Sequence, residues 1–332
     1  MAQVLAQMSN NFQTVPAECV LPPEKRPQEL LPSPADNIPV IDLSKAMGTE
    51  TERRQLVEEL MKAGQEYGFF QVINHGVPNE LMDDTMAMYK EFFHLPYEEI
   101  SKYTANRTPM SSGKNQPIYW KDTIRHGLRP LEDQIKTWPE NPARYREVLA
   151  SYVNETSKAA SEILKLFAEG LGLENEYFKG ELSDDEYLVS HYYPPCPDPS
   201  LTLGLYPHGD VNLLTILQQD AFGLQFIKDG KWLTADVIPN AFVVSVAIQL
   251  QVISNGKLIS PDHRVVTNSK TSRSSVCIFV APSRKCFVEP AKALINDANP
   301  PLYKSYTYAE YMADYMPKMG SDVETALASF KL

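Results

Sequence analysis

The sequence predicts an α+β fold in which helices buttress a double-stranded β-helix, the cupin-like jelly roll. Two observations lead to this expectation. Apolar residues recur with helical spacing in the first half of the chain, whereas the second half consists of short apolar segments separated by Gly, Pro and Asn turns. Helices followed by strands are typical of α+β proteins, and many short strands can share one buried face in a jelly roll. The 332 residues contain no internal repeat, so both halves are expected to share one core.

The N-terminal part, residues 1–36, is expected to form an extended, proline-rich arm. Seven prolines lie between residues 16 and 39. Proline fixes φ and removes a hydrogen-bond donor, which disfavours regular helices and central strands. The arm is therefore expected either to lie over the surface of the domain or to form a loose leader.

Residues 37–145 are expected to contain both helices and strands. In order, the hydrophobic pattern predicts a strand at 40–43, an amphipathic helix at 52–67, a buried strand at 69–73 and a second helix at 80–93. Gly68 ends the first helix, and Pro96 follows the end of the second. Residues 102–118 lack any hydrophobic period, which predicts a flexible loop.

The rest of the chain is expected to hold the functional core. An apolar stripe with a 3.6-residue period predicts a long helix at 143–171. The jelly-roll core is expected at residues 184–284, where turns such as Asp229-Gly230 separate the strands. Residues 285–332, which contain five tyrosines between positions 300 and 315, are expected to form a helical segment that covers the mouth of the barrel.

The composition is that of an ordinary globular protein, with 43% hydrophobic and 22% charged residues. A formal net charge of −11 argues against binding to nucleic acid or to an anionic membrane surface. The first residues lack an apolar region, so we expect no signal peptide, and no apolar run has the length that spans a membrane. The four cysteines show no C-x-x-C spacing, which indicates free thiols in a reducing compartment. We therefore expect a cytoplasmic monomer that acts on a small molecule.

His208, Asp210 and His263 are the candidate metal ligands. Two neutral imidazoles and one carboxylate form the facial triad of non-haem Fe(II) enzymes, which leaves the remaining coordination positions open. Side chains two residues apart on a strand point to the same face, so the H-x-D pair can bind one ion. The second histidine is expected on a strand that is distant in sequence and adjacent in space.

Arg273 is the candidate carboxylate clamp, because a planar guanidinium can bind a carboxylate through two parallel hydrogen bonds. The segments that flank the ligands and the clamp are apolar and strand-like, which makes the pattern more specific than an isolated H-x-D pair. Metal ligands beside a carboxylate clamp imply an iron enzyme that uses an organic acid as its cosubstrate.

Together with the segments that flank them, these residues make the chain resemble the plant 2-oxoglutarate- and Fe(II)-dependent dioxygenases from about residue 38 to residue 319. The resemblance rests on the H-x-D pair, on the segment 187–197 and on the R-x-S pair of Arg273 and Ser275. It implies an enzyme that needs Fe(II), 2-oxoglutarate and O2, with ascorbate as the reductant. It also implies that Arg273, Ser275 and Tyr193 bind the distal carboxylate of 2-oxoglutarate. The substrate would be hydroxylated at a C–H bond, with epoxidation, desaturation and dealkylation as other outcomes of the same chemistry.

The chain departs from the family pattern at three places, one of which is Tyr206-Pro207 just before the first ligand, where an aromatic ring is expected close to the substrate. His191 stands where relatives usually have the asparagine of N-x-Y-x-P, which puts its contact with the cosubstrate in doubt. His191 is also a decoy for a metal ligand, and we reject it because the triad is already complete. Residues 245–248 (SVAI) replace the N-x-G-D of many relatives. This change is expected to remove a polar group near the iron and to narrow the pocket wall.

The substrate pocket is expected to be mostly apolar with one positive charge. The resemblance implies that Thr123 and Arg125 face the pocket from one strand, and Tyr206, two residues before the first ligand, is expected to add an aromatic ring. The other expected wall residues are Val189, Phe279 and Ala281. Such a cavity suits a small molecule that contains a ring.

Two substrate classes are open. Within the family, segments such as 119–123 and 289–292 are most similar to the branch that hydroxylates tropane alkaloids, which implies a tropane amine of specialised plant metabolism. A protonated amine would favour a carboxylate in the pocket. The 102–118 segment instead carries Lys102, Arg107 and Lys114 and no acid. This favours a neutral or acidic substrate, such as a phenylpropanoid or flavonoid, an indoleamine or a terpenoid acid.

Two other functions compete with this one. A non-catalytic, cupin-like binding or hormone-sensing module would keep the fold and lose the iron, but an intact triad with an R-x-S pair argues against it. A dioxygenase that uses no keto acid, as in ethylene formation, would fit the same segments. The closer resemblance to the hydroxylases disfavours this second rival.

Overall fold

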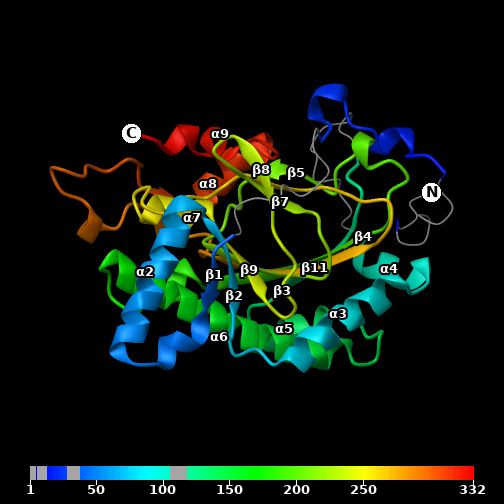
Figure 1. Ribbon diagram of the computed structural model, residues 1–332, viewed down its shortest axis with the longest axis horizontal. Helices are drawn as coiled ribbons and strands as arrows, with labels where there is room; N and C mark the ends of the chain where they lie inside the picture. Colours follow the sequence, from blue (N-terminus) through cyan, green and yellow to red (C-terminus); the bar gives the residue numbers. More distant parts are fainter. Residues whose placement is uncertain (1–4, 6–12, 28–37, 105–117) are drawn as a thin grey trace.

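The computed structural model of the protein describes residues 5, 13–27, 38–104 and 118–332 (Figure 1). It has the α+β architecture that the sequence predicts. Two β-sheets form a jelly roll, and helices pack on the outer face of the larger sheet. In the described ranges, no helix is both long and apolar enough to cross a membrane.

Within the described part of the chain, the larger sheet has seven strands and the smaller sheet has four. The spatial order of the larger sheet is β1 (Val40–Asp42), β2 (Phe69–Ile73), β9 (Phe242–Val246), β6 (Leu214–Gln219), β11 (Arg273–Ala281), β4 (Asp185–Tyr193) and β3 (Asp122–Gly127). The smaller sheet has the order β5 (Leu205–His208), β10 (His263–Val265), β7 (Leu224–Lys228) and β8 (Lys231–Thr234). Strands β1 and β2 run parallel, and the neighbours within the smaller sheet run antiparallel.

The inner faces of the two sheets meet in an aromatic contact close to one candidate ligand. Phe69 of β2 stacks on Phe226 of β7 with ring centroids 5.1 Å apart, and the Phe69 ring centroid lies 5.4 Å from that of His263. Both phenylalanines are buried. The apolar filling of the jelly roll therefore holds the strand that carries His263 against the larger sheet.

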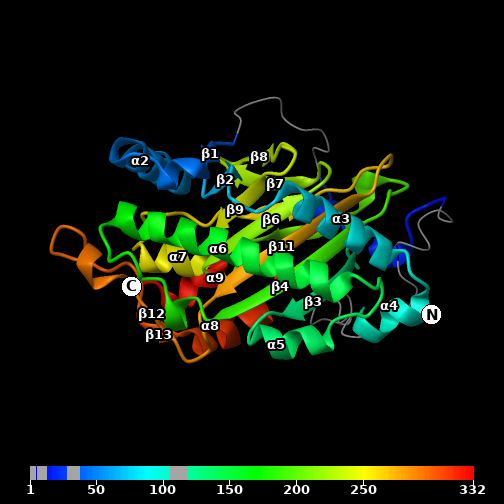
Figure 2. The same ribbon diagram turned by 90° about the horizontal axis from the view of Figure 1, so that it is seen from below.

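Three long helices buttress the larger sheet: α6 (Tyr145–Leu171), α3 (Asn79–Phe93) and α2 (Glu50–Glu66) (Figure 2). Helix α6 contacts β11 and β6 through a stripe of buried residues, α3 packs on α6, and α2 packs on α6, β1 and β2. Helix α2 begins with a capping box, in which Thr49 and Glu52 each accept a hydrogen bond from the other's backbone N–H. The helices expected at 52–67, 80–93 and 143–171 are thus confirmed, with small shifts at their ends.

The structure adds three short helices to those expected: α4 (Tyr97–Thr104), α5 (Leu131–Gln134) and α7 (Ile248–Ile253). Helix α4 follows Pro96, whose carbonyl oxygen accepts from the backbone N–H of Ile100 at 3.2 Å. A proline that stops one helix can begin the next, because its fixed φ suits a helix N-terminus. The first residues of the loop expected at 102–118 are therefore helical, and residues 105–117 of that loop lie outside the described part of the chain.

The described part of the N-terminal arm lies on the domain as two short 3-10 helices, and not as a fully extended chain. These helices span Ala17–Cys19 and Pro23–Lys25. Cys19 is buried in a cluster with Trp120 and Cys196. The side chains of the arm thus complete an apolar cluster at the end of the jelly roll.

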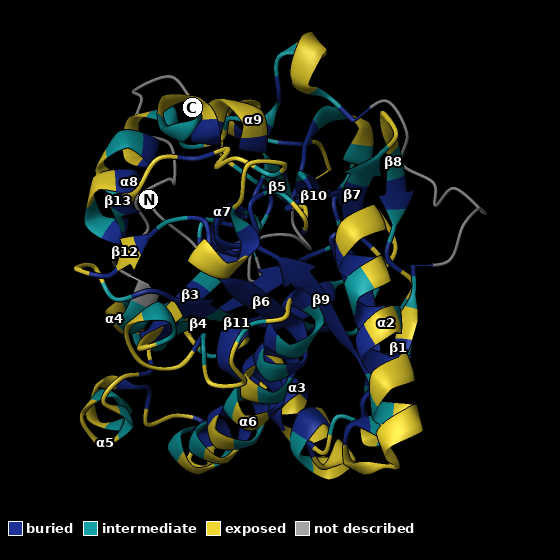
Figure 3. Ribbon diagram, turned by 90° about the vertical axis from the view of Figure 1, so that its left-hand side faces the viewer, coloured by how far each residue is buried: buried dark blue, intermediate teal, exposed yellow. Residues whose placement is uncertain are grey.

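The C-terminal segment folds back onto the smaller sheet. Helix α8 (Tyr308–Tyr315) begins later than the sequence suggested, and α9 (Val323–Leu327) follows it. The backbone N–H of Val323 donates to Asp262 Oδ1 at 3.0 Å. Figure 3 shows α9 beside β5 and β10, the strands that carry the two candidate histidines.

Gly68, between α2 and β2, is expected to be essential for stability. Its φ is +64°, and a Cβ atom there would lie 2.2 Å from the carbonyl oxygen of Ile259. We expect Gly68→Ala to lower the free energy of unfolding by about 2 kcal/mol or more, because a strained backbone adds to a main-chain clash. Denaturant unfolding measures this loss. The control is Gly172→Ala, at φ +73° with no atom within 4 Å of the new Cβ. Equal losses in the two variants would contradict the assigned clash.

Candidate active site

His208, Asp210 and His263, called the triad below, converge at one end of the smaller sheet. His208 ends β5 and His263 begins β10, and antiparallel pairing places their Cα atoms opposite each other. The Asp210 Oδ1 atom lies 3.8 Å from His208 Nε2 and 3.6 Å from His263 Nε2. One ligand atom of each residue lies within 4.8 Å of the other two, so a single ion can contact all three.

The carboxylate of the triad is placed by a loop, which corrects the expectation that the H-x-D pair shares one face of a strand. Strand β5 ends at His208, and Asp210 lies beyond it. The Thr215 hydroxyl of β6 donates to Asp210 Oδ2 at 2.7 Å, and the backbone N–H of Ile248 donates to the Asp210 carbonyl oxygen at 2.9 Å. The other carboxylate oxygen, Oδ1, lies toward the two imidazoles. Thr215 therefore links the triad to the larger sheet.

Apolar side chains pack tightly around the loop between the first two ligands. Residues 245–248, where many relatives have N-x-G-D, form the end of β9 and the start of α7, and all four are buried. At Gly209, a Cβ atom would lie 2.1 Å from Val323 Cγ2 of α9 and 3.4 Å from Ile248 Cδ1. Only a glycine leaves room for both helices beside the ligands. Apolar side chains of α7 and α9 therefore enclose this side of the site.

Both imidazoles are arranged to offer a lone pair. His208 Nδ1 lies 2.8 Å from the Tyr206 carbonyl oxygen, and His263 Nδ1 lies 3.4 Å from that of Pro261. A carbonyl only accepts, so the His208 proton resides on Nδ1 and Nε2 is free for a metal. Burial lowers the pKa of His208 to about 3, which keeps the ring neutral. Neutral nitrogen donors with one carboxylate fit Fe(II).

Arg273 is a buried cation that has no ion pair with any carboxylate of the described chain. It begins β11 opposite Tyr193 of β4, and its guanidinium lies 5.0 Å from the centroid of that ring. It donates to Gln219 Oε1 at 2.9 Å and to the Ala221 carbonyl oxygen at 3.2 Å, and it reaches Ser275 Oγ at 3.5 Å. These neutral partners fix the guanidinium without cancelling its charge. Such a group is suited to receive an anion.

The strand register places the expected cosubstrate and substrate residues on one face of the larger sheet. Alternate residues of a strand share a face, and so do their Cα partners on neighbouring strands. By this pairing the face carries Arg273 with Tyr193, Ser275 with His191 and Thr123, Cys277 with Val189 and Arg125, and Phe279 with Tyr187 and Thr215. Because Thr215 bonds to Asp210, this is the face on which the triad lies.

His191 is engaged with the sheet and lies outside the triad. Its Nδ1 atom is 2.9 Å from Thr123 Oγ1. Burial, with a smaller contribution from the positive charge of Lys121, lowers the pKa of His191 well below its usual value. A neutral His191 can contact a bound molecule through its remaining nitrogen without adding a charge.

The residues expected to line the substrate pocket form two aromatic walls. Arg125 is exposed and lies 4.0 Å above the Tyr187 ring, which stacks on Phe279 at 4.7 Å with an interplanar angle of 8°. The buried Tyr206 ring centroid lies 5.1 Å from that of His208 and 5.2 Å from that of Tyr119. Val189 of β4 and Ala281 at the end of β11 are buried.

Sequence reasoning missed three residues of this site: Lys121, Thr215 and Tyr187. Lys121 and Tyr187 each stand two positions from an expected pocket residue, so strand alternation would have placed both on the same face. Nothing in the sequence indicates the role of Thr215, because that role depends on the path of the loop that carries Asp210.

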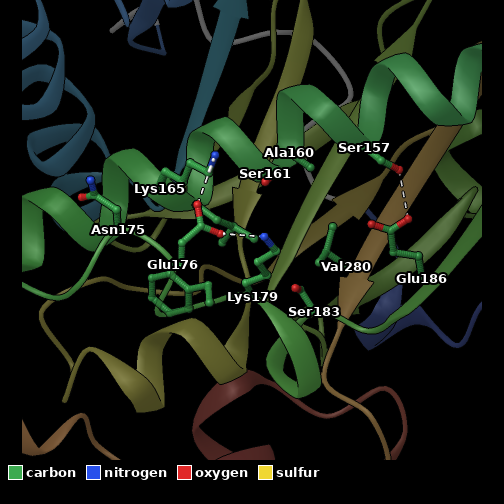
Figure 4. Close-up of a pocket in the computed structure, with 12 residues that line it drawn as sticks. Ser157, Ala160, Ser161, Lys165, Asn175, Glu176, Lys179, Ser183, Glu186 and Val280 are labelled. Atoms are coloured by element: carbon green, nitrogen blue, oxygen red, sulfur yellow. Dashed lines mark hydrogen bonds and ion pairs between the residues drawn. The ribbon is translucent and has the colours of Figure 1, made fainter.

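A pocket lies under α6, on the side of β11 opposite to the triad (Figure 4). Its volume is about 50 Å³, and Val280 of β11 lines it from the face opposite to Phe279. Its charged groups neutralise one another, since both Lys165 Nζ and Lys179 Nζ lie close to Glu176, at 3.4 and 3.2 Å. None of the expected site residues lines it.

Comparison with known proteins identifies the family. Residues 184–282 match the 2OG-Fe(II) oxygenase superfamily, and residues 38–144 match the N-terminal family described as non-haem dioxygenase in morphine synthesis. The chain belongs to the 2OG-Fe(II) oxygenase superfamily. This confirms the resemblance found in the sequence. The protein is therefore an enzyme that uses Fe(II), 2-oxoglutarate and O2, with ascorbate as the reductant typical of this superfamily.

Relatives of this oxygenase align with it along most of their length. Hyoscyamine 6-dioxygenase of Hyoscyamus niger is 41% identical, over 99% of both chains. The 2'-deoxymugineic-acid 2'-dioxygenase of Hordeum vulgare is 38% identical, over 86% of both chains. The crystal structure of JOX2 in complex with 2OG, Fe and JA has a TM-score of 0.88 at 32% identity, and the match covers 100% of this chain and 98% of that one.

Thr215 is expected to set the iron affinity of this oxygenase without touching the metal. Thr215→Val removes the hydrogen bond to Asp210 Oδ2 and keeps the β-branched shape. We expect iron to bind about 10- to 100-fold more weakly, the usual effect of losing a group that orients a ligand. Anaerobic Fe(II) titration measures this. The control is Thr85→Val, which removes a buried hydroxyl that bonds to the Leu81 carbonyl within α3. Unchanged iron affinity in Thr215→Val would contradict the assignment.

Proposed function

We propose that this oxygenase hydroxylates a C–H bond of a ring-containing plant metabolite, with the triad as the ligands of Fe(II). We assign Arg273, with Ser275 and Tyr193, to the distal carboxylate of 2-oxoglutarate. One observation carries the proposal: the triad and Arg273 lie on the same face of the larger sheet. Thr215 bonds the triad at one point of this face, and Arg273 begins β11 on the same face. A cosubstrate bound to the metal at one end can therefore lie along β11 with its other end at Arg273.

The protein residues contribute positioning and a water-poor cavity to this reaction. Iron bound here with 2-oxoglutarate supplies oxygen activation, which couples conversion of the keto acid to succinate and CO2 with transfer of one oxygen atom to the substrate. Burial raises the pKa of Tyr193 to about 12, so its hydroxyl stays protonated and can donate to the carboxylate held by Arg273. The buried Tyr206 and Ile248 exclude water from the side of the first ligand.

The charge of the cavity supports a neutral or acidic substrate over a tropane amine. The two relatives of similar identity are named for different substrates, hyoscyamine and 2'-deoxymugineic acid, so overall similarity does not separate the classes. Arg125 lies over Tyr187 on the substrate side and forms no ion pair within the described chain. A protonated amine would meet repulsion there. We therefore favour a phenylpropanoid or flavonoid, an indoleamine or a terpenoid acid over hyoscyamine, and hydroxylation over epoxidation.

We further propose that the enzyme acts in the cytoplasm. Its four cysteines are free and buried, which suits a reducing compartment. The monomeric state expected from the sequence stays a prediction. A binding module without catalysis is disfavoured, because the ligand set is complete. A dioxygenase without a keto acid would leave the buried charge of Arg273 without a ligand.

Loss of any member of the triad is expected to abolish turnover. His208→Ala, Asp210→Ala and His263→Ala each remove one metal ligand, and the fold should survive because the core lies elsewhere. Succinate formation from 2-oxoglutarate measures the activity, and circular dichroism measures the fold. His94→Ala, at the exposed end of α3, is the control and should keep full activity. Full activity of the wild type after exhaustive chelation would contradict the proposal.

Arg273→Lys is expected to raise the KM for 2-oxoglutarate by about 10- to 100-fold, because lysine keeps the charge and loses the bidentate guanidinium. Succinate formation in the absence of organic substrate measures this KM directly. Arg129→Lys is the control, since Arg129 pairs with Glu186, whose side chain alternates to the other face of β4. An Arg273→Lys enzyme with an unchanged KM for 2-oxoglutarate would show that the clamp is assigned to the wrong residue.

A further inference from the structure

Lys121 places a buried amino group on the face of the larger sheet that carries the triad, and it takes no part in binding iron or 2-oxoglutarate as assigned above. It precedes β3 by one residue, and strand alternation with Thr123 and Arg125 places it on the pocket face. Its Nζ atom is shielded from solvent and finds no hydrogen-bond partner in the described chain. The pKa values of His191 and His208 are lowered chiefly by burial, and the charge of Lys121 adds to both shifts. Lys121 therefore acts on the same cavity as the triad.

An unpartnered ammonium in such a place is costly to the folded protein. Burial lowers the pKa of Lys121 to about 7, and the positive charge of Arg273 acts in the same direction. A hydrophobic residue of similar length would pack there without this cost. An anion that enters the cavity would restore the charged form and offset the cost, as is common at functional sites.

Iron and the cosubstrate do not supply this anion. The positive charges of Fe(II) and Arg273 equal the negative charges of Asp210 and dianionic 2-oxoglutarate, so this set is neutral by itself. Arg125, and Lys121 in its protonated form, have no compensating anion in this set. Lys121 is level with Tyr193 at the start of β3, and Arg125 is level with Val189, four residues further along the chain. Among the described residues, neither cation forms an ion pair with a carboxylate.

We propose that Lys121 is a substrate-binding residue that holds the carboxylate of an acidic substrate on the face of the larger sheet that carries the triad. The apolar ring of that substrate then packs on Tyr187 and Phe279, which stack next to Arg125. The substrate class is a small, ring-containing organic acid. This inference rests on the proposed function, because the triad and Arg273 define which face is the cavity.

The test compares acids with their uncharged esters. The enzyme is loaded with Mn(II) and N-oxalylglycine, an inert analogue of 2-oxoglutarate, and titrated calorimetrically. The probes are cinnamate, indole-3-acetate and abietate, each paired with its methyl ester, and hyoscyamine serves as the cationic probe. In the wild type, at least one acid should bind more tightly than its ester. Lys121→Met should weaken that acid about 30-fold or more and leave the ester unchanged, whereas Lys121→Arg should keep most of the preference.

Two further measurements distinguish a substrate-binding role of Lys121 from a folding defect and from a role in cosubstrate binding. Lys121→Met should raise the Tm of the ligand-free enzyme, because it removes an unpaired buried charge, so a folding defect cannot imitate the result. Succinate formation without substrate tests the proposed function independently, and should persist in Lys121→Met. Lys228→Met is the control for both, since Lys228 lies over Tyr67 and beside Asp229.

Four results would overturn the inference: equal affinity for acids and esters, no binding by any acid, tighter binding of hyoscyamine, or a raised KM for 2-oxoglutarate in Lys121→Met with acid binding unchanged. The last result would assign Lys121 to the cosubstrate. Absence of all succinate formation by the wild type would instead refute the proposed function itself.

Discussion

The antiparallel pairing of β5 with β10 is the constraint on which the active site depends. It sets His208 opposite His263, and no side-chain adjustment could bring the two imidazoles together if this register slipped by one residue. The carboxylate is then brought to them by Thr215, a residue of the other sheet. Closing the metal site therefore requires both sheets to be correctly packed, and the stacked rings of Phe69 and Phe226 maintain that packing.

Charge is distributed unevenly across the face on which the triad lies. The clamp and the ammonium of Lys121 are both buried in surroundings that provide dipoles and aromatic rings but no ion pair within the described chain. Hydrophobic residues at these positions would make a more stable protein. Under the proposed assignments, the enzyme gives up folding free energy at the positions where bound anions would return it. Neutral His191 and protonated Tyr193 fit this arrangement, because neither adds a charge of its own.

Much of this arrangement could be predicted from the sequence. The helical period and the strand alternation of apolar residues reflect which side of each element faces the core. The long helices and the ligand types followed from such local patterns. The position of Asp210 in a loop beyond β5 could not be predicted in this way. It depends on hydrogen bonds from Thr215 and Ile248, which only the folded chain brings near. The burial of the Lys121 ammonium likewise depends on how β3 pairs with β4. Helix α4 was missed because a proline reads equally as the end of one helix or the start of another.

The contact between Val323 and Gly209 has a consequence for the order in which the protein is made. The chain emerges from the ribosome N-terminus first, so the jelly-roll strands exist before α9 is synthesised. Until then, the peptide between the first two metal ligands lacks the helix that packs on it. A nascent chain can therefore form much of its core before the loop between the proposed metal ligands is fully packed, because that packing requires α9.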